Sequence, residues 1–171
     1  MSLQLILTRH AKSDWDDPAL SDHDRPLNPR GQRDAPRVGA WLKAQGHCPD
    51  LALISSAVRA QETWARLSPA FGVDVGMITL PTLYLAPAEQ MLTALRKSAI
   101  GAQSVMMIGH NPGIGDFAQQ ILGARPDHSR FADYPTCATL VVSFAARAWA
   151  EVAWGSGRAV DFIVPRDLPQ E

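Results

Sequence analysis

The stretch LILTRHAKSDW, residues 5–15, decides how this chain folds, because an apolar run ends within it and charged residues follow at once. Leu3–Thr8 has the composition of a short buried strand. Arg9 and His10 come directly after it, where a strand of an α/β sheet leaves the core. Ligands bind outside the carboxyl ends of such strands. The pair therefore marks one edge of the predicted sheet as a candidate site.

Apolar runs and helical patterns alternate along the rest of the chain, which is typical of an α/β fold with parallel strands. Helices are predicted over residues 31–46, over Val58–Leu67, from Pro87 onward and from Ile114 to Gly123. Further strands are predicted at Leu51–Ile54, Met77–Leu80, Val105–Ile108, Thr139–Phe144, Trp149–Trp154 and Phe162–Val164. We expect one domain over residues 1–171, because this length suits a single core and no repeat or long linker interrupts it.

The bulk composition argues against several classes of protein. Sixteen basic and seventeen acidic residues give a formal charge of −1, which disfavours a broad nucleic-acid surface. The longest apolar stretch, CATLVVSFAA at residues 137–146, is too short to span a bilayer. Cys48 and Cys137 lack metal-pair spacing and fit a reduced, cytoplasmic compartment, and the five histidines lack the spacing of a zinc motif. We expect a monomer that binds neither nucleic acid nor membrane.

Two more predicted strands end in polar residues. Arg59 follows Leu51–Ile54 within the segment SSAVRA, and His110 follows Val105–Ile108 within GHNP. Because the carboxyl ends of parallel strands share one edge of a sheet, Arg59 and His110 should lie close to Arg9 and His10. Each signal alone would fit an ordinary surface or core residue, so the prediction depends on their occurring together.

These side chains suit the transfer of a phosphoryl group. Its negative charge is spread over three equatorial oxygens, and the planar guanidinium fork of arginine fits those oxygens. A neutral imidazole, with a reference pKa of about 6.5, is a competent nucleophile near pH 7. A second histidine, if protonated, would donate to the charge that develops in the transition state. The residues alone leave open which of His10 and His110 is the nucleophile.

The motifs LTRHAKSDW, DRPLNPRG, SSAVRAQET and GHNPG resemble the histidine phosphatase superfamily, the phosphoglycerate-mutase-like enzymes, and within it the small SixA-type phosphohistidine phosphatases. The resemblance implies a three-layer α/β/α sandwich with a mostly parallel central sheet. It implies that His10 is the nucleophile that carries the phosphoryl group, and that no metal or organic cofactor takes part. Residues around the phosphate would be Arg9, Arg59 and His110, with Lys12, Ser13 and Asn111 as further candidates for substrate binding.

The sequence departs from the superfamily's general pattern in three places. Ala11 stands where glycine is common, and Ala57 and Val58 stand where a proline often follows the serines. Larger members also place a carboxylate near the site to protonate an oxygen leaving group. In the corresponding region here, TLPTLYLAPAEQM, Glu89 is the only carboxylate. Glu89 is therefore either the catalytic acid or an exposed helix residue.

The lack of an evident general acid bears on the choice of substrate. An alkoxide leaving group gains a factor of about 10²–10⁴ from proton donation, whereas imidazole leaves a P–N bond with much less help. Between Thr63 and Tyr84 no long insertion is left to cap the pocket. We therefore predict hydrolysis of phosphohistidine on a phosphorylated protein, through a phosphohistidine intermediate at His10. A small-molecule phosphomonoesterase on the same fold is the main alternative, and a non-catalytic phosphate-binding module is a weaker one.

Two further segments leave other interpretations open. DHDRPLNPRG, residues 22–31, is a turn-rich connector, or else it places Arg25 or Arg30 to steer phosphate or a partner. The run GIGDFA, residues 113–118, matches a relaxed dinucleotide fingerprint, with Asp133 at a plausible distance. Its glycines lie beyond the strand end, with Pro112 between, whereas the fingerprint needs glycine in the tight turn itself. This argues against nucleotide binding.

Overall fold

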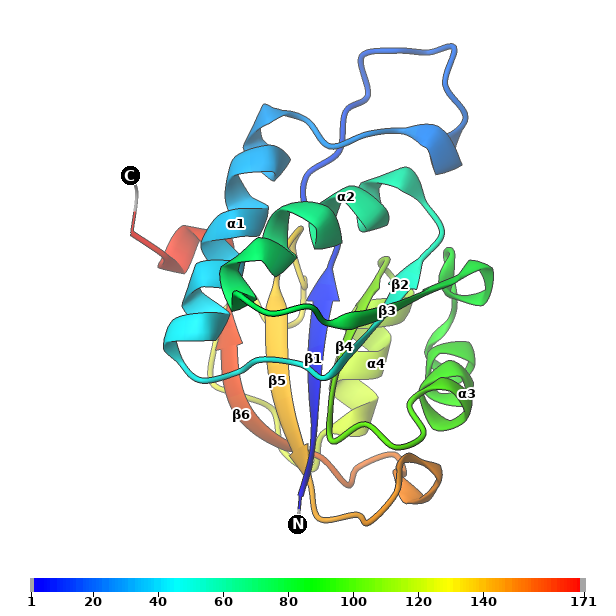
Figure 1. The fold of residues 1–171 in the computed structure, drawn as a ribbon, viewed down its shortest axis with the longest axis vertical. Helices are drawn as coiled ribbons and strands as arrows, with labels where there is room; N and C mark the ends of the chain where they lie inside the picture. Colours follow the sequence, from blue (N-terminus) through cyan, green and yellow to red (C-terminus); the bar gives the residue numbers. More distant parts are fainter. Residues whose placement is uncertain (1, 170–171) are drawn as a thin grey trace.

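The computed structural model describes residues 2–169, which form a six-stranded sheet in the order β3-β2-β4-β1-β5-β6 (Figure 1). The strands are β1 (Leu3–Arg9), β2 (Leu51–Ser55), β3 (Gly76–Leu80), β4 (Ser104–Gly109), β5 (Thr139–Phe144) and β6 (Arg158–Ile163). The pairs β1–β4, β2–β4 and β2–β3 are parallel, and β5 is antiparallel to both β1 and β6. Of these six strands β5 alone runs against the others, so the mostly parallel sheet is confirmed.

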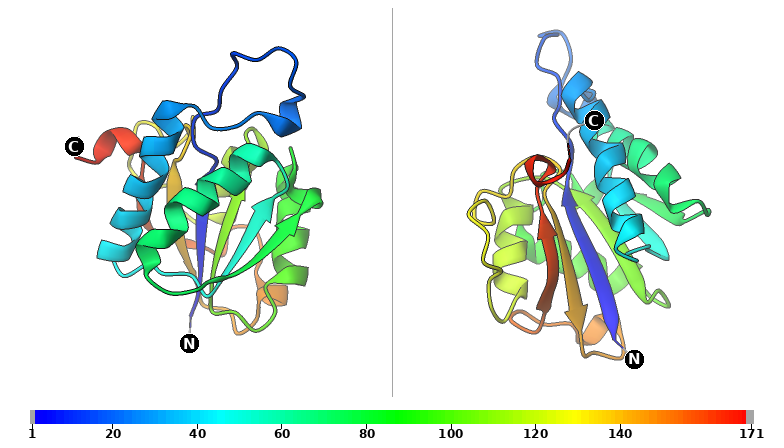
Figure 2. Two further views of the ribbon diagram at one scale, coloured as in Figure 1. Left: turned by 45° about the horizontal axis from the view of Figure 1, so that its top comes forward. Right: turned by 90° about the vertical axis from the view of Figure 1, so that its left-hand side faces the viewer.

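Helices cover both faces of the sheet, as Figure 2 shows. The helices α1 (Pro29–Ala44) and α2 (Val58–Leu67) pack on one face, and α3 (Ala88–Ser98) and α4 (Gly113–Ile121) pack on the other. Neighbouring residues of β1 divide between the two cores: Leu5 and Leu7 lie on the side of α3 and α4, and Ile6 lies on the side of α1 and α2. This alternation follows from the pleat of a strand. The predicted three-layer sandwich is confirmed.

A local capping signal sets the start of α1. The side chain of Asn28 accepts a hydrogen bond from the backbone N–H of Gly31 at 2.9 Å, and Pro29 occupies the first helical turn. Proline is tolerated there because the first backbone N–H groups of a helix have no partner within it. The helix therefore begins at Pro29, two residues before the predicted start.

The strand predicted at Trp149–Trp154 is wrong. Those residues contain a short 3₁₀ helix, η4 (Trp149–Glu151), and the indole N–H of Trp149 donates to the carbonyl oxygen of Ala102 at 2.7 Å. The aromatic residue is buried to anchor a loop, and its apolar character mimics a strand signal. The last strand, β6, begins earlier than the predicted Phe162–Val164, because an edge strand that is partly exposed carries no continuous apolar run.

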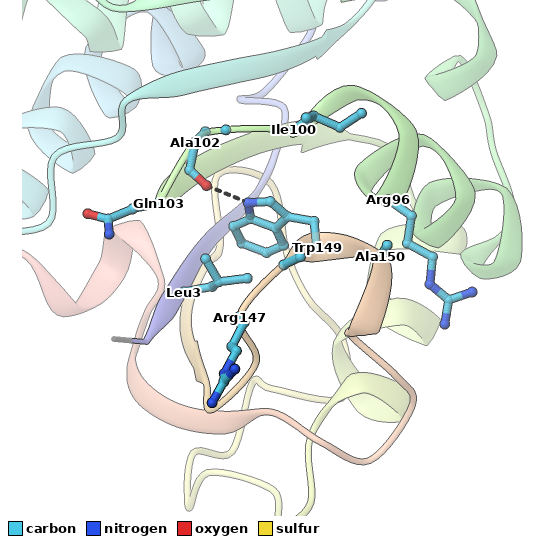
Figure 3. A pocket seen from close by; sticks show the side chains of 10 residues that line it. Leu3, Arg96, Ile100, Ala102, Gln103, Arg147, Trp149 and Ala150 are labelled. Carbon is cyan, nitrogen blue, oxygen red and sulfur yellow. Dashed lines mark hydrogen bonds between the residues drawn. The ribbon is translucent and has the colours of Figure 1, made fainter.

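A cavity of about 570 Å³ lies at the amino ends of β1 and β4 (Figure 3). Its wall includes Leu3, Arg96, Ile100 and Trp149. Arg96 donates to the carbonyl oxygen of Val152, so this guanidinium serves the chain's own backbone. The cavity is at the opposite end of the sheet from the predicted site. No helix within residues 2–169 is long and apolar enough to cross a membrane.

Substitution of Gly31 tests how closely α1 packs against the loop that follows β1. A Cβ atom on Gly31 would lie 2.1 Å from the carbonyl oxygen of Lys12 and 2.9 Å from its nitrogen. Gly31→Ala should therefore destabilise the fold by about 1–3 kcal/mol, although alanine favours helix. Chemical denaturation measures this. Gly76→Ala is the control, since its Cβ would meet only ordinary contacts at 3.7 and 3.9 Å. Equal stability of the two variants would contradict the close packing.

Candidate active site

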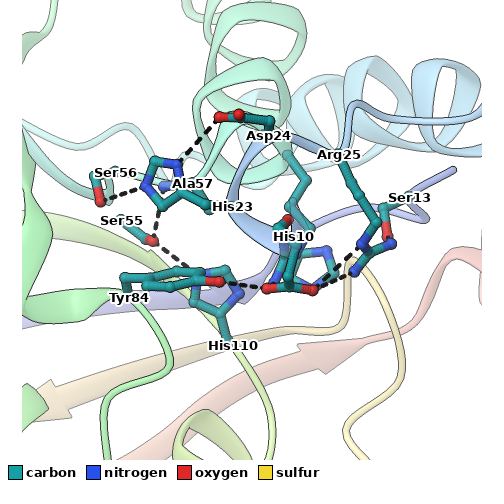
Figure 4. Close-up of polar contacts among 12 residues, drawn as sticks. His10, Ser13, His23, Asp24, Arg25, Ser55, Ser56, Ala57, Tyr84 and His110 are labelled. Carbon is teal, nitrogen blue, oxygen red and sulfur yellow. Dashed lines mark hydrogen bonds and ion pairs between the residues drawn. The ribbon is translucent and has the colours of Figure 1, made fainter. Parts of the chain in front are cut away.

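The parallel register brings three strand ends to one place. Arg9 pairs with Gly109 across β1 and β4, and Ile54 pairs with Ile108 across β2 and β4. The residues that follow these strands therefore share one edge of the sheet. The imidazole rings of His10 and His110 lie with centroids 5.2 Å apart. Figure 4 shows both rings in one cluster of polar side chains.

His10 is held in a defined tautomer. Its Nδ1 is 2.7 Å from the carbonyl oxygen of Ala11. Because a carbonyl oxygen only accepts, Nδ1 carries the proton and Nε2 keeps its lone pair. Burial lowers the pKa of His10 well below the ordinary 6.5, and the positive charges of Arg9 and Arg59 lower it further. The ring is thus neutral, with Nε2 available as a nucleophile.

His110 is held by Ser55. The Nε2 atom of His110 is 2.7 Å from the hydroxyl oxygen of Ser55, which also accepts the backbone N–H of Ala57 at 3.2 Å. If the Ser55 hydroxyl donates to Nε2, the proton of His110 resides on Nδ1. Burial, and then Arg59, lower the pKa of His110 to about 3. His110 is therefore a neutral N–H donor here, whereas a cationic donor was considered from the sequence.

Both arginines leave one nitrogen buried without a hydrogen-bond partner. Arg9 donates through Nη1 to the carbonyl oxygen of Tyr134 at 3.2 Å, and Arg59 donates through Nη1 and Nη2 to Asp22 at 2.7 and 3.0 Å. The Nε atoms of both residues and the Nδ1 atom of His110 are buried and unpartnered. Leaving such groups unsatisfied costs about 1–3 kcal/mol each. Unpartnered Nε–H groups on two arginines, with a third nitrogen on His110 that is a donor in the Nδ1–H tautomer, suit an oxyanion ligand.

A fifth residue, Asp22, completes this arrangement and was not predicted as a site residue. It lies in η1 (Asp22–Asp24), within a loop over residues 14–25 that we call the strap. Its carboxylate accepts hydrogen bonds from Arg59, from Arg25 and from the hydroxyl of Tyr84. Partial burial alone would raise the pKa of Asp22, but these donors lower it below its ordinary value. Asp22 is therefore ionised and fixes the guanidinium of Arg59.

Comparisons with known proteins agree with this geometry. The model of the histidine phosphatase superfamily (branch 1) matches residues 5–83. An uncharacterized protein of Mycobacterium tuberculosis is 32% identical over 163 residues, covering 92% of this chain and 99% of the relative. The phosphohistidine phosphatase SixA of Escherichia coli is 27% identical over 115 residues, covering 66% of this chain and 70% of SixA. A structure assigned as phosphohistidine phosphatase SixA from Nakamurella multipartitia superposes with a TM-score of 0.77 at 27% identity, covering 96% and 97% of the two chains.

This chain belongs to the histidine phosphatase superfamily. It is accordingly a phosphatase, an enzyme that hydrolyses phosphoryl groups. Among the described residues no group of three or more histidine, cysteine, aspartate or glutamate side chains could hold a metal ion.

Two predicted substrate-binding residues of this histidine phosphatase have their polar atoms engaged within the chain. Ser13 is buried, and its hydroxyl accepts from Nη1 of Arg25 at 2.7 Å. The amide of Asn111 donates to the carbonyl oxygens of Asp133 and Tyr134 and accepts the backbone N–H of Gly115. Both side chains hold together the loops that surround the site.

The remaining candidates lie further out. Lys12 is partly exposed, and its carbonyl oxygen accepts the N–H of Asn28 at 3.0 Å. Glu89 is exposed on α3, and the structure brings Asp22 rather than Glu89 to Arg59. Arg30 is exposed on α1 and pairs with the buried carboxylate of Asp34 at 3.6 Å. Glu89 is thus an exposed helix residue in this structure, and its role as the acid and the role of Arg30 in steering phosphate stay predictions.

The fingerprint-like run at residues 113–118 packs against the protein rather than opening to a nucleotide. A Cβ atom on Gly113 would lie 1.8 Å from the carbonyl oxygen of Ala86. Glycine is needed there because α4 starts against the segment that leads into α3. The close approach thus has a packing reason.

Two buried neutral histidines should make the folded state sensitive to acid. Because the pKa values of His10 and His110 lie below 6.5 in the folded chain, the unfolded chain binds more protons as the pH falls below about 6.5. The free energy of unfolding should then fall by up to about 1.4 kcal/mol per pH unit for each histidine. His110→Gln removes one titrating group, so urea titrations between about pH 6 and pH 4 should show a shallower fall. Equal slopes for wild type and variant would contradict the neutral state of His110.

Asp22→Asn tests whether the strap positions Arg59. Loss of the charge-assisted hydrogen bonds, worth about 1.5–3 kcal/mol, should free the guanidinium and lower kcat/KM by about tenfold or more. Asp16→Asn is the matched control, since it makes the same charge change at an exposed position of the strap. Steady-state kinetics on one substrate measures both variants. Increased activity in Asp22→Asn would instead identify its carboxylate as a competitor of phosphate.

Proposed function

We propose that this phosphatase hydrolyses phosphohistidine displayed on a protein, through a covalent phosphohistidine at His10. The observation that carries the proposal is the set of three buried, unpartnered nitrogens, Nε of Arg9, Nε of Arg59 and Nδ1 of His110, on residues whose charges or rings lie near His10. They suit the three equatorial oxygens of a phosphoryl group in transfer. Neutral His10 supplies the nucleophile in the same cluster.

In the first step Nε2 of His10 attacks phosphorus. The P–N bond to the substrate imidazole breaks, and its electron pair returns to the departing nitrogen. A substrate ring protonated on its other nitrogen leaves as neutral imidazole. The positive charge that His10 acquires is stabilised by the carbonyl oxygen of Ala11, which accepts the Nδ1 proton.

In the second step water attacks the phosphorus of the phosphohistidine. The P–Nε2 bond breaks, its electron pair returns to Nε2, and His10 is again neutral. Both protons of the water leave with the product as dihydrogen phosphate, which then ionises in solution. Arg9 and Arg59 stabilise charge on the equatorial oxygens in both steps, because the two transition states carry the same oxygens.

The preference for a P–N bond rests on the acid–base state of the site. Asp22 reaches the site but is ionised, and it already accepts the proton of the Tyr84 hydroxyl. Glu89, the acid considered from the sequence, is exposed on α3. An alkoxide would lose the factor of about 10²–10⁴ that proton donation supplies, whereas imidazole would lose little.

The relatives support the same substrate class. The matched proteins of Escherichia coli and Nakamurella multipartitia carry the name phosphohistidine phosphatase, and each is 27% identical to this chain over the aligned part. A phosphorylated protein is therefore the partner that we propose. A small phosphorylated molecule is the alternative, and the two differ in the leaving group that the site must accept.

Phosphate release from phosphoramidate and from 4-nitrophenyl phosphate, both in EDTA, tests the proposal. Wild type should release phosphate from both, with the larger kcat/KM on the P–N compound, and His10→Ala should release none. Arg59→Ala should lose a factor of about 10²–10³ in kcat. A preference for the ester would favour the phosphomonoesterase and make Glu89 the next residue to substitute. Absence of release from either compound would favour a binding module.

The covalent step needs its own measurement. Rapid quenching at alkaline pH, followed by peptide mass spectrometry, should find a phosphoryl group on His10 during turnover. The group should be lost on acid treatment, as expected for a P–N bond. A phosphoryl group on His110 instead, or steady turnover in His10→Ala, would overturn the assignment of the nucleophile.

A further inference from the structure

Two aromatic rings extend the histidine cluster towards the strap. The ring of Tyr84 lies edge-to-face with His110, with centroids 5.5 Å apart and an interplanar angle of 87°. The ring of His23 lies 4.8 Å from Tyr84 at 75°. Figure 4 shows Tyr84 and His23 on one side of His10, and Arg25 and Ser13 on the other. The four rings thus run in sequence from His10 through His110 and Tyr84 to His23.

Both outer rings are fixed by their polar atoms. The hydroxyl of Tyr84 donates to Asp22, and Nε2 of His23 forms a hydrogen bond with the hydroxyl of Ser56 at 3.0 Å. Burial, and then the hydrogen bond to Asp22, raise the pKa of Tyr84 above 10, so the hydroxyl remains a donor. The rings come from separate segments that these bonds hold together. Such anchoring preorganises a surface before a ligand arrives.

The backbone after Tyr84 also turns in an unusual way. Leu85 has φ of 51°, in the left-handed region that residues other than glycine rarely adopt, and its side chain is exposed. The preceding Leu83 is buried and anchors the segment in the core. After this turn Tyr84 faces the site and not the core. An aromatic residue normally gains more from burial in the core. Strained turns of this kind cluster at ligand sites.

Tyr84 lies beside two of the predicted phosphate ligands. It contacts His110 on one side, and the guanidinium carbon of Arg59 lies 6.0 Å from its ring centroid. The nucleophile and the leaving group stand on opposite sides of the phosphorus in an in-line displacement. The ring of Tyr84 is separated from His10 by His110. It therefore lies away from the nucleophile, next to the phosphate ligands His110 and Arg59.

We propose that Tyr84 and His23 form an aromatic wall that binds the leaving group and selects a planar ring. This inference rests on the proposed function, because it assigns the wall to the imidazole of phosphohistidine. An edge-to-face pair leaves the faces of one ring uncovered by its partner, and a flat imidazole can stack there or meet an edge. A leaving group without a ring gains nothing from the wall. Tyr84 and His23 are thus specificity-determining residues.

Paired substrates isolate this effect. Phosphohistidine and phosphoramidate both contain a P–N bond, but only phosphohistidine has a ring. Tyr84→Leu removes the aromatic ring and the hydroxyl, whereas Tyr84→Phe removes the hydroxyl alone and is the matched control. Relative to Tyr84→Phe, Tyr84→Leu should lose about 3- to 10-fold in kcat/KM on phosphohistidine, as expected for one aromatic contact, and less than about twofold on phosphoramidate. His23→Leu should show the same selective loss.

The outcomes separate the wall from the proposed function. Equal losses on the two P–N substrates, or no loss on phosphohistidine, would overturn the wall while leaving the phosphohistidine phosphatase intact. Activity on phosphoramidate also reports whether each variant is folded. If wild type hydrolyses esters but neither P–N compound, the proposed function fails.

In that case the wall predicts that Tyr84→Leu loses activity selectively on 4-nitrophenyl phosphate, which has a ring, compared with glycerol phosphate, which has none. Equal losses on these two esters would overturn the wall.

Discussion

The parallel pairing of β4 with β1 on one side and with β2 on the other is the constraint on which the rest of the site depends. Each of these strands ends in a different part of the phosphate site, and hydrogen bonds along the sheet fix the three ends relative to one another. The side-chain period of a strand is two, so a slip of one residue would turn the alternating core positions of β1 to the wrong face. The two apolar cores therefore enforce the register that brings His10 next to His110.

Positive charge at this edge contributes to two properties of the site. Arg9 and Arg59 lie near each other, and burial together with Arg59 lowers the pKa of Arg9. Asp22 compensates Arg59, while Arg9 has a carbonyl oxygen as its partner. Burial is the first cause of the lowered pKa values of His10 and His110, and the remaining positive field lowers them further and also attracts an anion. An imidazole that stays neutral beside two arginines retains the lone pair that a nucleophile needs.

The sequence was informative wherever a signal was local. Strand ends followed by Arg9, Arg59 and His110 predicted both the sheet and the meeting of these residues. The capping of α1 by Asn28 is also local, but the prediction began this helix at residue 31 and missed it. Asp22 could not be found from such a local signal, because its partner Arg59 is 37 residues away, with α1 and β2 between them, and the strap that holds Asp22 carries no periodic pattern. The hydrogen bonds of Asn111 to a distant loop were hidden for the same reason. Trp149 misled the prediction because a buried aromatic residue has the same composition signal in a strand and in a loop anchor.

The two halves of the site are built from different kinds of structure. The phosphate half comes from strand ends and from the first turn of α2, which are fixed by the sheet and its cores. The proposed leaving-group half comes from the strap and from the turn after η3 (Pro81–Leu83). Asp22 in the strap links this turn to the phosphate half by accepting from both Tyr84 and Arg59. Substitutions in those loops can alter the leaving group that is accepted without disturbing the register that positions the nucleophile. The proposed division would let one phosphoryl chemistry serve different leaving groups, because the sheet and its cores hold the strand ends, whereas loops carry the proposed leaving-group side.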